Sequence, residues 1–200
     1  MNELEYLIEQ LNLIIGFLDI SDEEVYDQIK SRDKYQFGLS IDSLYKGNYE
    51  NYRNHVTTSS LILGFTHFED FITKIIAKSL LKFPKKNKIK VTINRFQELG
   101  SGYVKALGED QARRLTFSEK INLIKNIYND IDSDLIEEII FVNKIRNCLM
   151  HNNGYADKRL SPQILDGDKI SLTSGQINGY GLKIRDLAYK LWDKINLENS

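Results

Sequence analysis

Apolar residues recur at three- and four-residue spacing along residues 133–151, a period that places them on one face of a helix. The residues of this stripe are Leu135, Ile139, Val142, Ile145 and Leu149. Asn152, Asn153 and Gly154 follow directly, and these residue types tolerate the left-handed backbone that ends many helices. The sequence therefore predicts a helix that ends at or just after His151.

Three polar residues near the end of this predicted helix have side chains suited to phosphate chemistry. Arg146 precedes His151 by five residues, and Asn147 follows the arginine. A guanidinium group matches two phosphate oxygens, and an imidazole transfers protons near pH 7. The negative end of the helix dipole favours a protonated His151. Cleavage of RNA by its own 2'-hydroxyl requires a base, an acid and positive charge on the phosphoryl oxygens, which these groups supply.

The helical positions of Arg146 and His151 limit how they can act together. They differ by about 500° of rotation, which leaves them about 140° apart around the axis, and by about 7 to 8 Å of rise. One straight helix cannot direct both at a small ligand, whereas a nucleic-acid backbone or two helices related by two-fold symmetry could use both. The residues alone leave open the alternative of a surface arginine and a histidine that caps the helix.

The segment from Asn143 to Gly154 resembles the signature of the HEPN superfamily (higher eukaryotes and prokaryotes nucleotide-binding). In that signature an arginine and a polar residue are followed, after three further residues, by a histidine. The segment from Thr57 to Leu81, with Phe68-Glu69-Asp70-Phe71 at its middle, resembles the second helix of bacterial HEPN families found near defence genes. Thr116 to Lys120 resembles the start of their third helix.

The resemblance implies an all-α, up-and-down helical bundle with a small β-hairpin before the last helix. It further implies a metal-independent endoribonuclease of a toxin–antitoxin or antiphage type, without a cofactor, that acts on RNA as a homodimer and leaves 2',3'-cyclic phosphates. Arg146, Asn147, His151 and Glu69 would be its catalytic residues, and an antitoxin or defence-system protein its partner. The alternatives are a non-catalytic HEPN-like module that binds nucleotide or RNA or dimerises, and a helical adaptor.

Glu69 is notable without the resemblance, because it lies on an otherwise apolar helical stripe. The other members of that stripe are Ile62, Phe65, Ile72 and Ile76. A buried carboxylate needs a partner, and Arg146 is the expected one. The alternative is a carboxylate at the edge of the stripe that reaches water.

The charge of the chain is unevenly distributed, although its formal net charge is only −1. From Phe71 to Phe96 there are many lysines and no acidic residue, so Lys82, Lys85 and Lys86 are candidate RNA contacts. A solvated helix end would have the same composition.

Composition predicts one globular domain over residues 1–200, with 42% hydrophobic residues. We expect no membrane span, because no apolar run approaches about 20 residues, and no signal peptide, because the start lacks a basic segment. The single cysteine, Cys148, suits the cytoplasm, and we interpret it as a helix-packing residue rather than a reactive one. The histidines show no zinc-ligand spacing, so no metal site is expected.

Helical periodicity also appears on both sides of the motif. Residues 20–51 are acidic and less regular, and we interpret them as an insertion with one short helix near Asp22–Lys30. An Asp-Gly turn predicts a hairpin over Ile164–Leu172. Thr116 and Glu119 predict a capping box. The remaining predicted helices cover about 4–19, 53–82, 91–107, 116–127 and 177–195.

Overall fold

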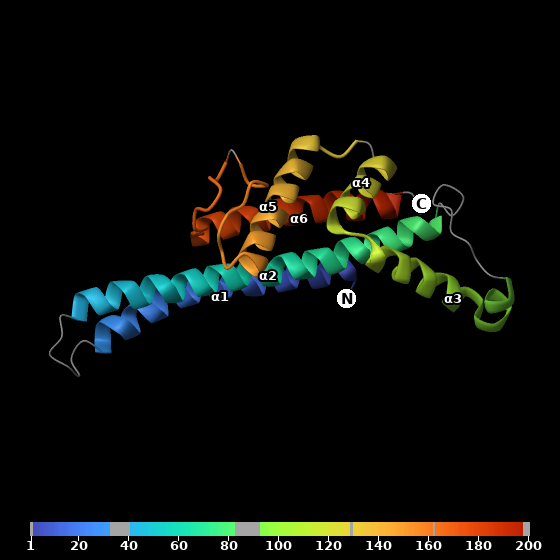
Figure 1. The fold of residues 1–200 in the computed structure, drawn as a ribbon. Helices are drawn as coiled ribbons and strands as arrows, with labels where there is room; N and C mark the ends of the chain where they lie inside the picture. The colour runs from blue at the N-terminus through green and yellow to red at the C-terminus, as the bar shows by residue number, and fades with distance from the viewer. Residues whose placement is uncertain (1, 33–40, 83–92, 129, 162, 198–200) are drawn as a thin grey trace. The chain divides into compact units, whose positions relative to one another are not determined.

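The computed structural model describes residues 2–32, 41–82, 93–128, 130–161 and 163–197 (Figure 1). These residues form six α-helices and no strand. The all-α prediction is therefore confirmed for the described part of the chain. The helices are α1 (Glu3–Arg32), α2 (Ile41–Lys82), α3 (Ile93–Arg114), α4 (Phe117–Ile127), α5 (Ser133–His151) and α6 (Ser174–Leu197).

The chain divides into two compact units. The first comprises Met1–Leu7, Thr66–Ile140 and Lys183–Ser200, and the second Ile8–Phe65 and Phe141–Leu182. The division falls within α1, α2, α5 and α6, so each of these helices contributes one part to each unit.

The core of the first unit forms around the second half of α2. Phe68, Phe71, Ile72, Ile75 and Ile76 are buried there because their three- and four-residue spacing places them on one stripe. The stripe is also covered from α4, where the rings of Phe68 and Phe117 lie 6.5 Å apart. Burial of each such side chain contributes about 1.5–3 kcal/mol.

Polar side chains fix the beginning and the end of α4. The predicted capping box is confirmed, since Thr116 Oγ1 accepts from the Glu119 backbone N–H (3.3 Å) and Glu119 Oε2 accepts from the Thr116 N–H (2.8 Å). The Thr116 hydroxyl also donates to Glu119 Oε2 (2.7 Å), and this bond, together with the one from the Thr116 N–H, lowers the pKa of the Glu119 carboxyl. At the other end, Tyr128 caps the helix, and its buried hydroxyl lies 3.0 Å from the Ser79 hydroxyl of α2.

Charged side chains connect other helices of the first unit. Lys78 Nζ of α2 lies 3.0 Å from Glu3 Oε2 of α1 and 5.1 Å from the ring centroid of Trp192 of α6. Lys183 of α6 pairs with Glu138 of α5 at 2.5 Å. Half-exposed pairs of this kind contribute little stability, so the apolar core carries most of it.

In the second unit α1 and α2 run side by side (Figure 1). A Cβ added to Gly64 of α2 would lie 3.5 Å from Leu11 Cδ2 and 3.8 Å from Ile14 Cδ1 of α1, in ordinary contact. The buried residues of this unit come from both helices, from the second part of α5, from the segment between α5 and α6, and from the first part of α6. They include Leu11, Leu18, Leu61, Phe65, Val142, Ile145, Cys148, Leu160, Ile170, Leu172 and Ile177.

The prediction of a less regular insertion over residues 20–51 is wrong for the described residues. α1 continues to Arg32, and α2 already begins at Ile41. The segment from Ser21 to Arg32 is weakly amphipathic, but it contains neither proline nor glycine and so nothing that stops a helix. Residues 33–40 lie outside the described part.

The predicted hairpin over Ile164–Leu172 is not confirmed. Its Asp-Gly turn is present, with the Asp168 N–H donating to the Leu165 carbonyl (3.1 Å) and Gly167 at a φ of 87°. The backbone after the turn pairs instead with the loop that follows α5, through an isolated antiparallel bridge between Tyr155 and Lys169. The turn residues were therefore informative, but they did not specify the pairing partner.

None of the helices in the described ranges contains an apolar stretch of the length that crossing a bilayer requires.

Replacement of Tyr128 by Phe tests the buried contact at the end of α4. We expect Tyr128→Phe to lower the free energy of unfolding by about 1 kcal/mol, because Ser79 loses this bond but keeps its 3.0 Å bond to the Ile75 carbonyl. Urea unfolding followed by circular dichroism measures the change. Tyr189→Phe is the control, since that ring is 44% exposed. Equal stabilities of the two variants would contradict the assignment.

Candidate functional site

The end of α5 has the geometry that its sequence predicts. The helix ends at His151, and the backbone then enters the left-handed region at Asn153 (φ 53°) and Gly154 (φ 81°). The N–H groups of Asn152 (2.9 Å) and Gly154 (3.3 Å) both donate to the Cys148 carbonyl, which satisfies it at the helix end. His151 is exposed in the last turn. Its imidazole therefore stands at the negative end of the helix dipole, open to solvent.

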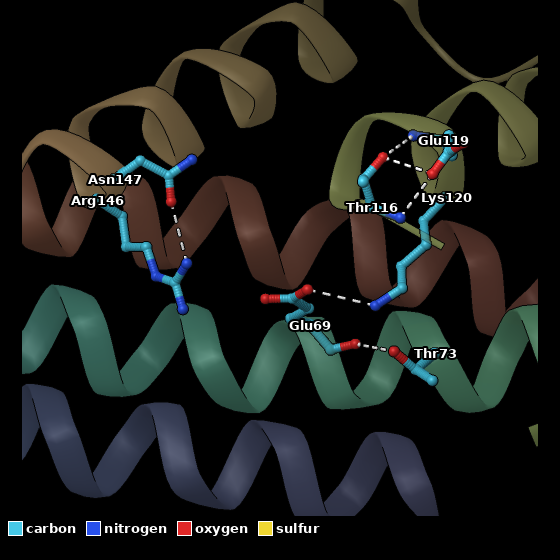
Figure 2. A network of polar contacts seen from close by, with 7 residues as sticks. All are labelled: Glu69, Thr73, Thr116, Glu119, Lys120, Arg146 and Asn147. Carbon is cyan, nitrogen blue, oxygen red and sulfur yellow. Dashed lines mark hydrogen bonds and ion pairs between the residues drawn. The ribbon is translucent and has the colours of Figure 1, made fainter. Parts of the chain in front are cut away.

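Arg146 lies five residues earlier on the same helix and is part-buried. Its Nη1 donates to Asn147 Oδ1 at 3.0 Å, as Figure 2 shows. Its Nε is buried and has no hydrogen-bond partner among the described residues. Buried donors without partners are few in folded proteins, so this one calls for a functional or structural explanation.

The structure thus brings Arg146 and Asn147 together, and it places His151 on the same helix. The bond that Arg146 donates to Asn147 fixes one edge of the guanidinium and leaves the other nitrogens as donors. A guanidinium with free donors can bind a phosphoryl group, and an exposed imidazole can transfer a proton. The second unit therefore supplies two of the groups that phosphodiester cleavage requires.

Glu69 belongs to the first unit, where the structure pairs it with Lys120, whereas the predicted partner Arg146 belongs to the second unit. Lys120 Nζ lies 3.3 Å from Glu69 Oε1 (Figure 2), and the side chains of Lys120 and Glu69 are 5% and 30% exposed. The contact between Phe68 and Phe117 brings the start of α4 to this face of α2. Helical periodicity predicted that Glu69 needs a partner, but no spacing rule identifies a lysine 51 residues away.

Cys148 is fully buried on α5, as expected for a packing residue. Burial raises the pKa of its thiol, and this keeps the less reactive protonated form. The interpretation of Cys148 as a packing residue is confirmed.

The candidate RNA contacts lie outside the part of the chain whose side chains the structure describes. Lys82 is the last residue of α2, and its side chain is not among the described ones. Both Lys85 and Lys86 lie wholly outside the described residues. In the ranges that are described, no group of three or more histidine, cysteine or acidic side chains could hold a metal ion.

Sequence reasoning missed two charged residues that follow the motif. Asp157 accepts from Asn152 Nδ2 at 3.0 Å and pairs with Arg159, whose Nε lies 2.9 Å from both carboxylate oxygens. Hydrogen bonds from Arg159 hold the pKa of Asp157 far below its usual range, so the carboxylate stays ionised at lower pH than an ordinary aspartate does. An acidic residue with an arginine two positions later was the only signal, and that pattern is common on surfaces.

The second unit also contains a cavity of about 440 Å³ between α1 and α2. Its lining is mostly apolar, and it includes neither Arg146 nor His151. The lining residues are Gln10, Leu13, Ile14, His55, Val56, Ser59, Ser60 and Leu63.

Replacement of Glu69 by Gln tests the pair with Lys120. We expect Glu69→Gln to lower the free energy of unfolding by about 1–2 kcal/mol, because it leaves a buried ammonium without an anionic partner. Chemical denaturation of the variant measures the loss. Glu137→Gln removes the same charge at an exposed position and serves as the control. If both variants unfold at the same denaturant concentration, the pair does not contribute to stability.

Comparisons with models of protein families, with curated proteins and with solved structures found no match to this chain.

Proposed function

We propose that this protein is a metal-independent endoribonuclease of the HEPN type that acts through Arg146, Asn147 and His151. The observation that carries the proposal is the presence, on one helix, of a guanidinium with only part of its donors bound and of an exposed imidazole. Asn147 fixes the guanidinium, while its Nε remains without a partner in the described part. Glu69 has a stabilising partner of its own, so the proposal depends on the three residues of α5.

In the proposed reaction, His151 takes the proton of the RNA 2'-hydroxyl, and the resulting oxygen attacks the adjacent phosphorus. The bond from phosphorus to the 5'-oxygen breaks, and that oxygen receives a proton. The products are a 2',3'-cyclic phosphate and a 5'-hydroxyl. Arg146 neutralises the charge that develops on the phosphoryl oxygens, which is the largest effect available to such a site. Asn147 keeps the guanidinium oriented for this contact.

The separation of Arg146 and His151 around α5 favours a site made from two copies of the chain. A rotation of about 140° directs the two side chains away from each other on one helix. Two copies of α5 related by two-fold symmetry would present two imidazoles and two guanidinium groups to one bound RNA backbone. The paired His151 residues would then divide the base and acid roles.

The proposal extends to a bundle of the HEPN type in the cytoplasm, and to a role as a toxin or antiphage effector that a partner protein keeps inactive. An uncontrolled endoribonuclease would damage the RNA of its own cell, and such an activity requires restraint. The RNA contacts would include the basic residues after α2, Lys82, Lys85 and Lys86.

Cleavage of RNA in EDTA tests the activity. We expect the wild-type protein to cut mixed RNA and leave cyclic phosphates, because imidazole and guanidinium need no metal. His151→Ala and Arg146→Ala should each reduce the rate by about 10²–10⁴-fold, as the loss of a general acid–base or a charge-stabilising group does. Mass spectrometry of the fragment ends identifies the products.

His55→Ala and Arg113→Ala are the matched controls, because each removes the same type of side chain from an exposed position. Retained cleavage by a folded His151→Ala protein would refute the proposed chemistry. No cleavage by any variant, including the wild type as a folded dimer, would favour a binding module instead.

Dilution tests the two-fold site. If two chains form each site, the activity per protein molecule should fall as the concentration drops below the dissociation constant of the dimer. Sedimentation measurements at the same concentrations give the fraction of dimer, and the two curves should coincide. Specific activity that stays constant while the dimer dissociates would show that one chain is sufficient.

A further inference from the structure

Hydrogen bonds connect the loop after α5 to the helix end that carries His151, and Asp157 takes part in most of them. Asn152, the residue after His151, donates from Nδ2 to Asp157 Oδ2 at 3.0 Å. Asp157 Oδ1 accepts from the Arg159 backbone N–H and from Arg159 Nε, both at 2.9 Å. Arg159 Nη2 also pairs with Oδ2, the same oxygen that Asn152 uses.

Asp157 also acts on the interior of the helix end. Cys148, one turn before His151, is buried, and this burial raises the pKa of its thiol. The backbone N–H of Asp157 lowers the pKa of the Cys148 thiol, and its carboxylate raises it. Asp157 therefore adjoins both the buried side of the last turn and the residue that follows His151.

The loop on both sides of Asp157 is itself fixed by backbone bonds. The Ala156 N–H donates to the Asp168 carbonyl at 2.7 Å, and the Leu160 N–H donates to the Asp157 carbonyl at 2.9 Å. Leu160 and Ala156 are buried. The side chain of Asp157 is 23% exposed, and it lies on a segment that these backbone bonds hold on both sides.

We infer that Asp157, with Arg159, is a positioning residue that fixes the last turn of α5 and thereby the direction of the His151 imidazole. This inference rests on the proposed function for its catalytic consequence. Its structural part is that the Asp157 carboxylate holds Asn152 and the helix end, and this can be tested without measuring RNA cleavage. A charge-assisted bond at a helix end stabilises more than a neutral one, and reacting groups lose rate when they shift by about 1 Å.

Asp157→Asn tests the inference, since it keeps the size of the side chain and removes its charge. Asp168→Asn is the matched control on the same segment, because that side chain is exposed and has no polar contact among the described residues. Amide hydrogen exchange of the Asn152 and Tyr155 N–H groups should accelerate about tenfold in Asp157→Asn, the change that corresponds to about 1.4 kcal/mol. The imidazole resonances of His151 should move in this variant and stay unchanged in Asp168→Asn.

The kinetic readout separates positioning from a merely structural role. Below the melting temperature of the variant, we expect kcat of Asp157→Asn to fall at least about tenfold while KM stays within about twofold, because substrate binding persists and the reacting group is displaced. Exchange rates and His151 resonances equal to those of Asp168→Asn would overturn the inference. A wild-type kcat in an Asp157→Asn protein that does show faster exchange would overturn its catalytic part.

The outcomes distinguish this inference from the function on which it rests. If the wild type does not cleave RNA, the proposed function fails, and the exchange and resonance measurements still decide whether Asp157 fixes the helix end. If the wild type cleaves RNA and Asp157→Asn matches the control in all three measurements, the function stands and the inference fails.

Discussion

The carbonyl of Cys148 is the acceptor on which the geometry of the candidate site depends. It receives the N–H groups of both Asn152 and Gly154, and this arrangement ends α5 directly after His151. Such an ending requires left-handed backbone, which asparagine and glycine adopt with little strain. A different residue at Gly154 would have space for its Cβ. The one atom within 4 Å of such a Cβ would be Leu149 Cδ2, at 3.9 Å. The constraint at this position is therefore conformational and not steric.

The buried cationic side chains of the two units differ in how completely their donors are bonded. In the first unit the ammonium of Lys120 is buried and paired, and breaking that pair costs more than an exposed pair would. In the second unit Arg146 has one bond to Asn147 and a buried Nε without a partner in the part of the chain described. An incompletely satisfied guanidinium reduces stability, and proteins commonly accept this loss where a group must bind something else.

The end of α5 was predictable because its signals are local. Residue types that favour left-handed backbone follow an apolar stripe, and the structure ends the helix at the predicted residue. The capping box at Thr116 was predictable for the same reason. The partner of Glu69 was not, because it depends on how α4 packs against α2, where Phe68 contacts Phe117. The role of Asp157 was equally hidden, since the bond to Asn152 forms only when the loop turns back.

The lengths of α1 and α2 illustrate a further limit of pattern reading. Periodicity predicts a helix from the apolar face that the helix buries. Where that face becomes polar, the periodic signal disappears. Helical backbone continues in such stretches when no breaking residue intervenes, as it does from Ser21 to Arg32. Tertiary pairing is harder still, and the Asp166-Gly167 turn shows this, because its backbone pairs with residues that precede it by more than ten positions.

The position of Cys148 allows opening motions near the candidate site to be measured by labelling of this native thiol. It is the one cysteine of the chain, and its side chain is buried beneath the last turn of α5. A thiol reagent can reach it only when the structure around it opens, so the rate of labelling reports on the opening of the surroundings of Cys148. The opening free energy at the motif can thus be followed in the unmodified protein, without an introduced label.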